Sequence, residues 1–372
     1  MSRRIHIRMW MLAISFLLLA VACSSSDDTE GTEAQQTMLS VYVYSPEHPL
    51  LIRSDVGQVS PTLDESKVNK LQIWVFESES GTLVGYLETK EGETALLNVS
   101  EGAVYQLPVT DDFVRRKPQV DVYVLANVDD SNCGVTLTGS STRAAINTAY
   151  LNENYFGLAS LVTSIPADGL PMSGVLKNQD VVGEAPVLRV GTSSIATVKV
   201  TRAVSKVRFV FANTTGASTL KIKRITLDEE VHPTSEYLIP RTETLLYNPT
   251  EATLWSGEET AVEKDNPEDY VYHTQTAQEY ETLIDQSGLT QMGPFYLRES
   301  DRRLTGVITY TIGDGVEHTR AFQMANAGDF LRNHTWIVYA YHQGGGYLLL
   351  DAVYVKDWNF LNEDVDHAIY NW

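Results

Sequence analysis

The sequence predicts an all-β protein built from β-sandwich domains, and three observations carry this prediction. Short runs rich in valine, isoleucine, tyrosine and phenylalanine recur along the chain. Turn residues, glycine above all, separate these runs. Helical patterns are weak and short, with candidates at residues 141–151 and 276–285. Many strands with few helices favour antiparallel sandwiches over a parallel α/β sheet.

Residues 1–22 predict a signal peptide. Arg3, Arg4 and Arg8 form a basic head before the apolar run at residues 9–20, which is the arrangement of a secretory signal. This run is too short for a transmembrane helix, which needs about 20 apolar residues.

Cys23 stands at the expected cut, between Ala22 and Ser24. This pattern resembles a bacterial lipobox, in which the cysteine sulfur receives a lipid and the cysteine becomes the new N-terminus. An ordinary signal peptide with an incidental cysteine is the alternative. Polar residues then predict a flexible tether over residues 23–37.

The strands expected in the first half of the chain begin with residues 38–44, where Leu39, Val41 and Val43 share one face. Further strands are expected at residues 71–76, 82–87 and 120–127. The first two of these are predicted to pair as a hairpin across a turn that ends at Gly81.

A long strand signal covers residues 195–211, and its alternation slips, which predicts a bulge near Val204. The later strands are expected at residues 220–227, 306–312, 335–341 and 347–355. Glycines at 344–346 predict a tight turn between the last two.

A segment with Pro186 and Gly191, residues 183–192, is the predicted seam between two domains. The chain of 372 residues is long enough for two domains, expected at residues 38–190 and 191–372.

Charge and cysteine content exclude some classes of partner and bond. The formal net charge is −20, and removing the three signal-peptide arginines leaves −23. Such a charge repels nucleic acid and anionic headgroups, so no nucleic-acid partner is expected. The two cysteines are Cys23 and Cys133. If Cys23 carries lipid, no intramolecular disulfide can form.

No enzyme signature is present in the sequence, so no catalytic residue, cofactor or metal site is expected. His334 and His342 have an even spacing that suits one strand face, but two unrelated polar residues are the simpler interpretation. Residues 129–132 lack the spaced ligands of a calcium loop. Cys133 has no nameable partner for nucleophilic chemistry.

Seven short segments, in order, resemble the fimbrillin family of Bacteroidales, which supplies subunits of lipoprotein-derived fimbriae. Ser300 departs from the family, which usually has asparagine there. The segments are residues 69–76, 81–84, 122–127, 170–174, 200–207, 295–300 and 331–338.

The resemblance implies two tandem transthyretin-like β-sandwich domains. It also implies lipoprotein export with lipid on Cys23, passage to the outer membrane, and cleavage by a maturation protease after an arginine near the first strand. That cut releases the N-terminal strand, and a strand from another fimbrial subunit takes its place by β-augmentation. The implied location is the outer membrane and the fimbrium at the cell surface, and the implied role is adhesion.

Arg53 and Ser54 are the residues of this chain that could carry the cut. They follow the first predicted strand in a stretch with Pro49 and Gly57, which predicts a loop open to a tryptic-like protease. The family often has Thr-Arg-Ala, whereas this chain has Ile-Arg-Ser, and a plain surface arginine is the alternative. Residues 359–372, beyond the last core strand, are expected to be a donor strand; the alternative is that this tail packs on its own domain and caps an edge strand.

Two other functions stay open on the sequence. A subunit that keeps its lipid would be a fimbrial anchor. A surface lipoprotein that binds a glycan or a protein through sandwich loops would use exposed aromatic residues such as Trp255 and Tyr270, although these could simply pack locally. The receptor is not identified by any motif.

Overall fold

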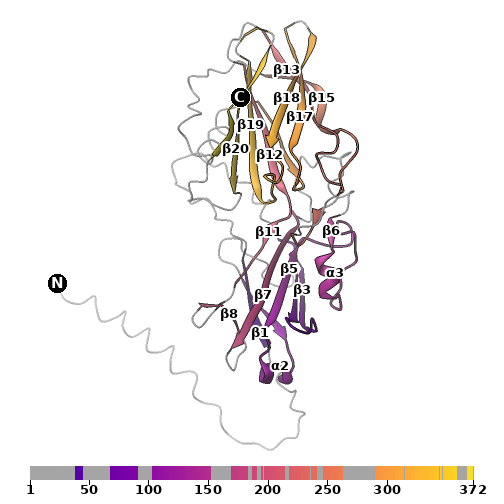
Figure 1. The fold of residues 1–372 in the computed structure, drawn as a ribbon, viewed down its shortest axis with the longest axis vertical. Helices are drawn as coiled ribbons and strands as arrows, with labels where there is room; N and C mark the ends of the chain where they lie inside the picture. Colours follow the sequence, from indigo (N-terminus) through magenta and orange to yellow (C-terminus); the bar gives the residue numbers. More distant parts are fainter. Residues whose placement is uncertain are drawn as a thin grey trace, which may run out of the picture. The chain divides into compact units, whose positions relative to one another are not determined.

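The structure is a computed structural model, and the compact unit that contains its described residues spans Thr37–Trp372. The described residues are 38–44, 68–90, 103–151, 169–182, 187–190, 194–195, 197–213, 218–234, 236–240, 246–262, 290–313, 315–342, 344–345, 347–357 and 367–371. Within them the fold is almost entirely β (Figure 1), which confirms the predicted fold class.

The first half of the chain forms a ten-stranded sheet system whose main path runs β10-β1-β8-β7-β5-β2-β3. The long strand β7 pairs with β5 through its first part and with β8 through its end, so it belongs to both layers of the sandwich. The elements of the first half of the chain, of which β6 lies outside this sheet system, are β1 (Met38–Tyr44), β2 (Lys70–Glu77), β3 (Leu83–Lys90), β4 (Ala103–Pro108), α2 (Asp111–Arg116), β5 (Val120–Ala126), α3 (Arg143–Asn147), β6 (Tyr150–Leu151), β7 (Met172–Val182), β8 (Val187–Val190), β9 (Ser194–Ile195), β10 (Thr197–Lys199) and β11 (Thr201–Arg202).

The second half forms two sheets, with strand orders β16-β12-β19-β20-β21 and β15-β13-β17-β18. Its elements are β12 (Ser205–Asn213), β13 (Leu220–Leu227), β14 (Glu236–Tyr237), β15 (Ala252–Val262), β16 (Thr290–Leu297), β17 (Leu304–Ile312), β18 (Val316–Ala325), β19 (His334–His342), β20 (Leu348–Asp357) and β21 (His367–Asn371). The short strand β14 pairs with β6, and this pair links the two halves.

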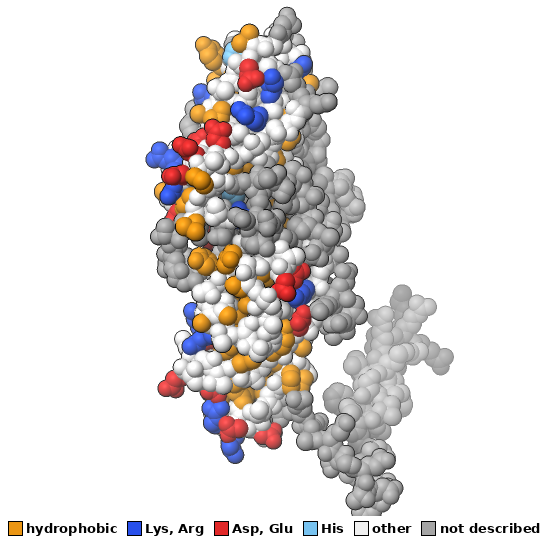
Figure 2. All heavy atoms as spheres, turned by 90° about the vertical axis from the view of Figure 1, so that its right-hand side faces the viewer, with side chains coloured by type: hydrophobic (Ala, Val, Ile, Leu, Met, Phe, Trp, Pro, Cys, Tyr) orange, Lys and Arg blue, Asp and Glu red, His pale blue; other side chains and the backbone are white. Residues whose placement is uncertain are grey.

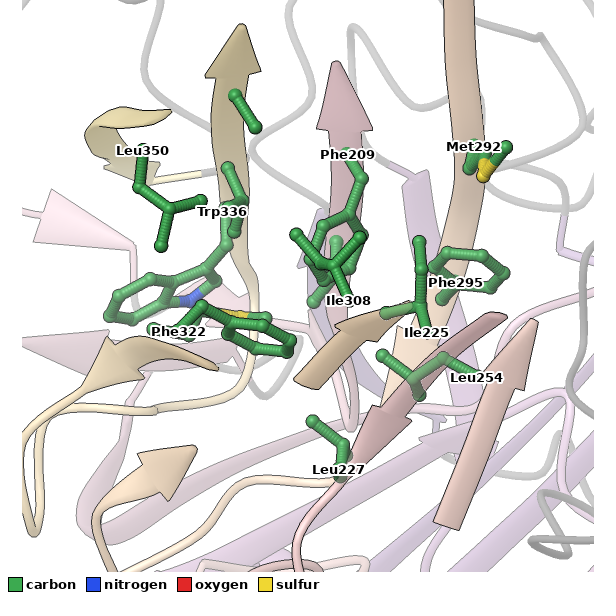
Figure 3. Close-up of a cluster of buried hydrophobic side chains, with 14 of the residues drawn as sticks. Phe209, Ile225, Leu227, Leu254, Met292, Phe295, Ile308, Phe322, Trp336 and Leu350 are labelled. Atoms are coloured by element: carbon green, nitrogen blue, oxygen red, sulfur yellow. The ribbon is translucent and has the colours of Figure 1, made fainter. Parts of the chain in front are cut away.

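Aromatic side chains fill the space between the two sheets of the second sandwich (Figure 3). Phe209 of β12 lies 5.2 Å from Phe322 of β18 and 6.2 Å from Phe295 of β16, measured between ring centroids. Trp336 of β19 stacks at a tilt against Phe330. Such edge contacts add to the burial of apolar area, which dominates the stability of a sandwich core.

The predicted strands at residues 38–44, 71–76, 82–87, 120–127, 220–227, 306–312, 335–341 and 347–355 are confirmed within a residue or a few at their ends. β2 and β3 form the predicted hairpin, and Gly81 has the positive φ of 68° that its turn requires. Gly344 and Gly345 also have positive φ, of 106° and 74°, between β19 and β20.

The slip in alternation near Val204 marks a change of sheet, and the register irregularity lies slightly later, between Val207 and Phe209, where β12 pairs with β16. Val198 and Val200 are buried in the first core, whereas Val207 is buried in the second. Strands β10 and β11 pair with β1 and β7, and β12 pairs with β16 and β19. Residues 203 and 204 therefore connect β11, which pairs in the first sandwich, to β12, which pairs in the second.

Helix predictions had mixed outcomes. The candidate at residues 141–151 contains α3, which begins after Thr142, whose hydroxyl accepts a hydrogen bond from the Ala145 amide. The candidate at residues 276–285 lies outside the described residues. Helix α2 was not predicted, because its six residues are too few for a periodic signal.

Candidate functional site: the first strand and its neighbours

The first strand of the chain, β1, lies inside its sandwich with partners along both of its edges. It pairs antiparallel with β4 from Met38↔Pro108 to Val43↔Ala103. On its other edge it pairs parallel with β10, from Tyr42↔Thr197 to Tyr44↔Lys199, and touches β8 at Ser40. Its main-chain hydrogen-bonding groups are thus shared with strands from three distant parts of the sequence.

The side chains of β1 alternate as the sequence predicts. Leu39, Val41 and Val43 have exposed fractions of 0%, 0% and 1%, and they belong to the first hydrophobic core. Their neighbours in that core include Leu107 of β4 and Val198 of β10. Burying a side chain of this size stabilises a fold by about 1.5–3 kcal/mol, so the three together contribute roughly 5–9 kcal/mol before entropy is counted.

A buried tyrosine hydroxyl lies beside β1. Tyr105 of β4 stands opposite Val41 in register, and only 5% of it is exposed. Its hydroxyl has no partner among the described residues. Burial raises the pKa of Tyr105 to about 12, so the hydroxyl stays neutral at physiological pH.

The residues expected to carry lipid and the cut, Cys23, Arg53 and Ser54, lie outside the part of the chain that the structure describes. Cys23 precedes β1, and Arg53 and Ser54 lie in sequence between β1 and β2. What the structure adds is the position of β1 itself, which the sequence identified as a strand but could not place inside a sheet.

The C-terminal tail contains an edge strand. β21 pairs antiparallel with β20 at four positions, from Ala352↔Asn371 to Val355↔His367, and forms the end of its sheet. Residues 359–366 lie outside the described residues. The part of the tail that is described therefore pairs with its own domain, as the alternative to a donor strand requires.

Several segments that resemble fimbrillin motifs meet where the two halves of the chain contact each other. Arg332, 7% exposed, donates to Glu299 Oε1 at 2.6 Å and to the carbonyl oxygens of Tyr237 and Leu238 at 2.8 and 2.9 Å. The Ser173 hydroxyl donates to the same Leu238 carbonyl at 2.5 Å. The Ser173 bond joins the first half to Leu238, and the charge-assisted bonds of Arg332 hold Leu238 in place within the second half.

Two asparagines in these segments have positive φ. Asn333, at φ 61°, donates its amide N–H to the Val204 carbonyl, and its side-chain oxygen accepts from the Arg202 amide. Asn127, at φ 58°, accepts from the Asn69 amide and donates to the Leu170 carbonyl. Asparagine tolerates the left-handed region better than most residues, which gives these motif positions a structural reason.

The residues considered for metal or nucleophilic chemistry have ordinary partners. His342 contacts Asn213 Oδ1 at 3.2 Å and the Gly345 carbonyl at 3.1 Å, while His334 contacts the Arg332 carbonyl at 2.8 Å. Asp129 accepts from the amide and hydroxyl of Ser131, at 2.7 and 2.6 Å. Burial, the largest influence, raises the pKa of Cys133, so its thiol is protonated and a poor nucleophile.

Within the described ranges, no group of three or more histidine, cysteine, aspartate or glutamate side chains could hold a metal ion. None of the helices described there has the length and hydrophobicity of a membrane span.

Acidic and basic side chains are interspersed on the face seen in Figure 2. The glycan-binding alternative loses one candidate, since Trp255 packs against the second core, while Tyr270 lies outside the described residues.

The sequence and the fold of this chain have matches among known proteins. The family model described as major fimbrial subunit protein (FimA) matches residues 52–186. No curated protein matches the sequence. The tip fimbrial protein Mfa3 from Porphyromonas gingivalis is 12% identical, with a TM-score of 0.46, over 87% of this chain and 100% of that chain.

Two further solved structures are similar at comparable levels. A proposed cell adhesion protein from Bacteroides eggerthii is 14% identical, with a TM-score of 0.47, over 90% of this chain and 98% of that chain. A fimbrial assembly protein from Parabacteroides distasonis is 13% identical, with a TM-score of 0.43, over 87% of this chain and 96% of that chain.

Proposed function

We propose that this chain, whose residues 52–186 match the family model of the major fimbrial subunit protein, is a structural subunit of a cell-surface fimbria that assembles by strand exchange. The observation that carries the proposal is the place of β1. It is a short N-terminal strand with both edges paired and three buried apolar side chains. Its removal would leave unpaired main-chain groups and an open apolar groove between β4 and β10.

Cleavage after Arg53 is the step that would free β1 in this proposal. Arg53 is the one arginine or lysine between the end of β1 at Tyr44 and Lys67, which comes just before β2. The family match starts at residue 52 and leaves β1 outside the matched region. A cut between Arg53 and Ser54 would therefore separate β1 from the family region and leave it held only by non-covalent contacts.

The donor strand in this proposal is the C-terminal tail of a second copy or of another fimbrial subunit. In its own sheet, β21 has one partner strand and four paired positions. The groove offers two partner edges, with six positions on β4 and three on β10. A strand that leaves a sheet edge for this groove gains main-chain hydrogen bonds and apolar burial, which gives exchange a driving force.

Export completes the proposal. Lipid on Cys23 would hold the precursor at the outer membrane until the maturation protease cuts after Arg53, and the released subunit would then join the fimbrium at the cell surface. A chain that is never cut would keep its lipid and would act as an anchor. Adhesion is the role expected of the assembled fimbria, and no step in this scheme requires this chain to act as an enzyme.

One experiment tests both covalent steps. N-terminal sequencing and intact mass of the protein from native outer membranes distinguish lipid on Cys23 from a new N-terminus at Ser54. The Arg53→Ala variant should remain long, lipidated and monomeric, whereas Ser54→Ala, which keeps the arginine, should be processed and should polymerise. Filaments formed by Arg53→Ala would show that the cut lies elsewhere or is not required.

A further inference from the structure

A pocket of about 480 Å³ lies on the first sandwich, between β2, β3 and the loop at residues 128–139. Its volume falls in the range of about 300–1,000 Å³ that small-molecule sites occupy. The residues of β1 do not line it. It is therefore a separate feature from the strand-exchange site, and its function does not depend on that proposal.

One wall of the pocket is a row of connected polar side chains on β2 and β3. Lys70 Nζ lies 3.5 Å from Glu88 Oε1, and the Tyr86 hydroxyl donates to Glu88 Oε2 at 2.9 Å. Gln72, which is 2% exposed, directs its Nε2 to the Tyr86 hydroxyl at 3.3 Å. Burial, the largest influence, raises the pKa of Tyr86 to about 12, so its hydroxyl keeps its proton at neutral pH.

The opposite wall is apolar at its base and acidic at its rim. Val128, Val135 and Leu137 line the base together with the buried Cys133. Asp129 and Asp130 stand on the loop at the rim. Burial raises the pKa of Asp129, but the Ser131 hydroxyl and amide outweigh it and hold this pKa below its usual value. Both walls are therefore ready to contact a ligand with polar edges and an apolar face.

The loop that closes the pocket is fixed in place. Trp74 Nε1 donates to the Thr138 carbonyl at 2.9 Å, and Asn132 Nδ2 donates to the Asn127 carbonyl at 2.8 Å. Gly139 approaches Tyr86 so closely that an added Cβ would lie 2.7 Å from the tyrosine ring. A site formed by contacts of this kind is preformed, so a ligand would pay little for ordering it.

We propose that this pocket binds a neutral saccharide of one or two hexose units. Each sugar hydroxyl both donates and accepts, and the pocket offers both functions side by side, with donors on Lys70 and acceptors on Glu88 and Asp130. The pocket repels an anionic ligand, because the carboxylates of Glu88, Asp129 and Asp130 outnumber the single ammonium group of Lys70. A cationic ligand would have to lie beside Lys70. The apolar base suits the C–H face of a pyranose ring.

The test uses the full chain and four probes, the methyl glycosides of mannose, galactose, glucose and N-acetylglucosamine. Saturation-transfer NMR and calorimetric titration measure their binding, with N-acetylneuraminic acid and Nα-acetyl-lysine amide as charged comparators. Glu88→Gln keeps the size of the side chain and an oxygen that accepts from Tyr86, but removes the charge. Asp130→Asn likewise keeps the size of the side chain and removes its charge, at an exposed position. Glu251→Gln, an exposed glutamate in the second sandwich, is the control.

At least one neutral glycoside should bind, and Glu88→Gln and Asp130→Asn should each weaken it by about tenfold or more, since each removes a charged hydrogen-bond acceptor. Glu251→Gln should leave binding unchanged, and the melting temperatures of all three variants should match the wild type. The proposal is overturned if none of the four glycosides binds at millimolar concentration. It is equally overturned if the pocket variants bind as the wild type does, or if a charged comparator binds better.

Discussion

Leu39 offers the sharpest test of strand exchange, because its partner Leu107 provides a matched control. The two leucines face each other across β1 and β4, and each is 0% exposed in the same core. Replacing a buried leucine by alanine costs about 2–5 kcal/mol through lost transfer energy and a residual cavity. In the uncut precursor, Leu39→Ala and Leu107→Ala should therefore be similarly destabilising.

After cleavage the two substitutions should behave differently. Leu39 would leave with β1, whereas Leu107 would stay in the groove of the assembled subunit. A loss of about 2–5 kcal/mol corresponds to a melting temperature lower by about 4–20 °C for a domain of this size. It also corresponds to release of the cleaved β1 that is roughly 30-fold to 4,000-fold faster if the rebinding rate is unchanged.

The assay compares three states of each variant: precursor, trypsin-cleaved monomer and filament. Urea and thermal melts report the precursor, and mass spectrometry of the released peptide reports the dissociation of β1. We expect Leu39→Ala to weaken the precursor and to leave the filament as stable as wild type, and Leu107→Ala to weaken both. Equal destabilisation of the filament by the two variants would show that β1 remains in the assembled protein, and the reasoning would fail.

Four further perturbations follow from the described contacts. Truncation after Trp358 removes the edge strand β21, so the precursor should melt within a few degrees of wild type while filament formation stops; a large drop in melting temperature would assign the tail to its own domain. Tyr105→Phe removes a buried hydroxyl that has no partner among the described residues and should leave the free energy of unfolding unchanged or raise it by up to about 1–3 kcal/mol. Tyr310→Phe, whose hydroxyl accepts from the Leu348 amide at 3.0 Å, should lower it in the same urea titration. Arg332→Met should cost about 3–5 kcal/mol in urea unfolding, because it removes the buried guanidinium that donates to Glu299 and to the carbonyls of Tyr237 and Leu238, whereas the exposed Arg302→Met should cost under about 1 kcal/mol. Burial raises the pKa of Asp121, but the Asn178 amide, the Ser78 hydroxyl and Arg143 outweigh it and lower this pKa. The wild type should therefore be more stable than Asp121→Asn by its full margin above pH about 4, and this margin should vanish as the pH falls further. A difference between the two proteins that stays constant from pH 7 to pH 2 would refute this assignment.

Strands were predictable from the sequence where one face is apolar and turn residues bound the run. Residues 38–44 alternate cleanly, and the structure buries the expected face. The segment at residues 195–211 failed, because β-branched residues continue without a break while the chain changes sheets at Ala203 and Val204. A run of residues with strand propensity carries no information about which sheet it joins.

Sites that depend on distant pairing could not be predicted. The wall of the pocket comes from β2 and β3, and its rim comes from the loop at residues 128–139. The contact of Arg332 with Leu238 likewise joins positions that no local pattern relates. Isolated polar residues such as Gln72 and Arg332 look like surface residues in a sequence, and only their burial shows that they matter.

The position of β1 also sets an order of events during biosynthesis. β1 is made first, yet one of its two edges pairs with Thr197–Lys199. At about 5–20 residues per second, the ribosome reaches Lys199 roughly 8–30 s after Tyr44. Closing so long a loop also carries an entropy cost that local hairpins such as β2–β3 avoid. β1 is therefore expected to dock last in its sandwich. Until it docks, each nascent subunit has both an unpaired apolar strand and an empty groove that accepts such a strand.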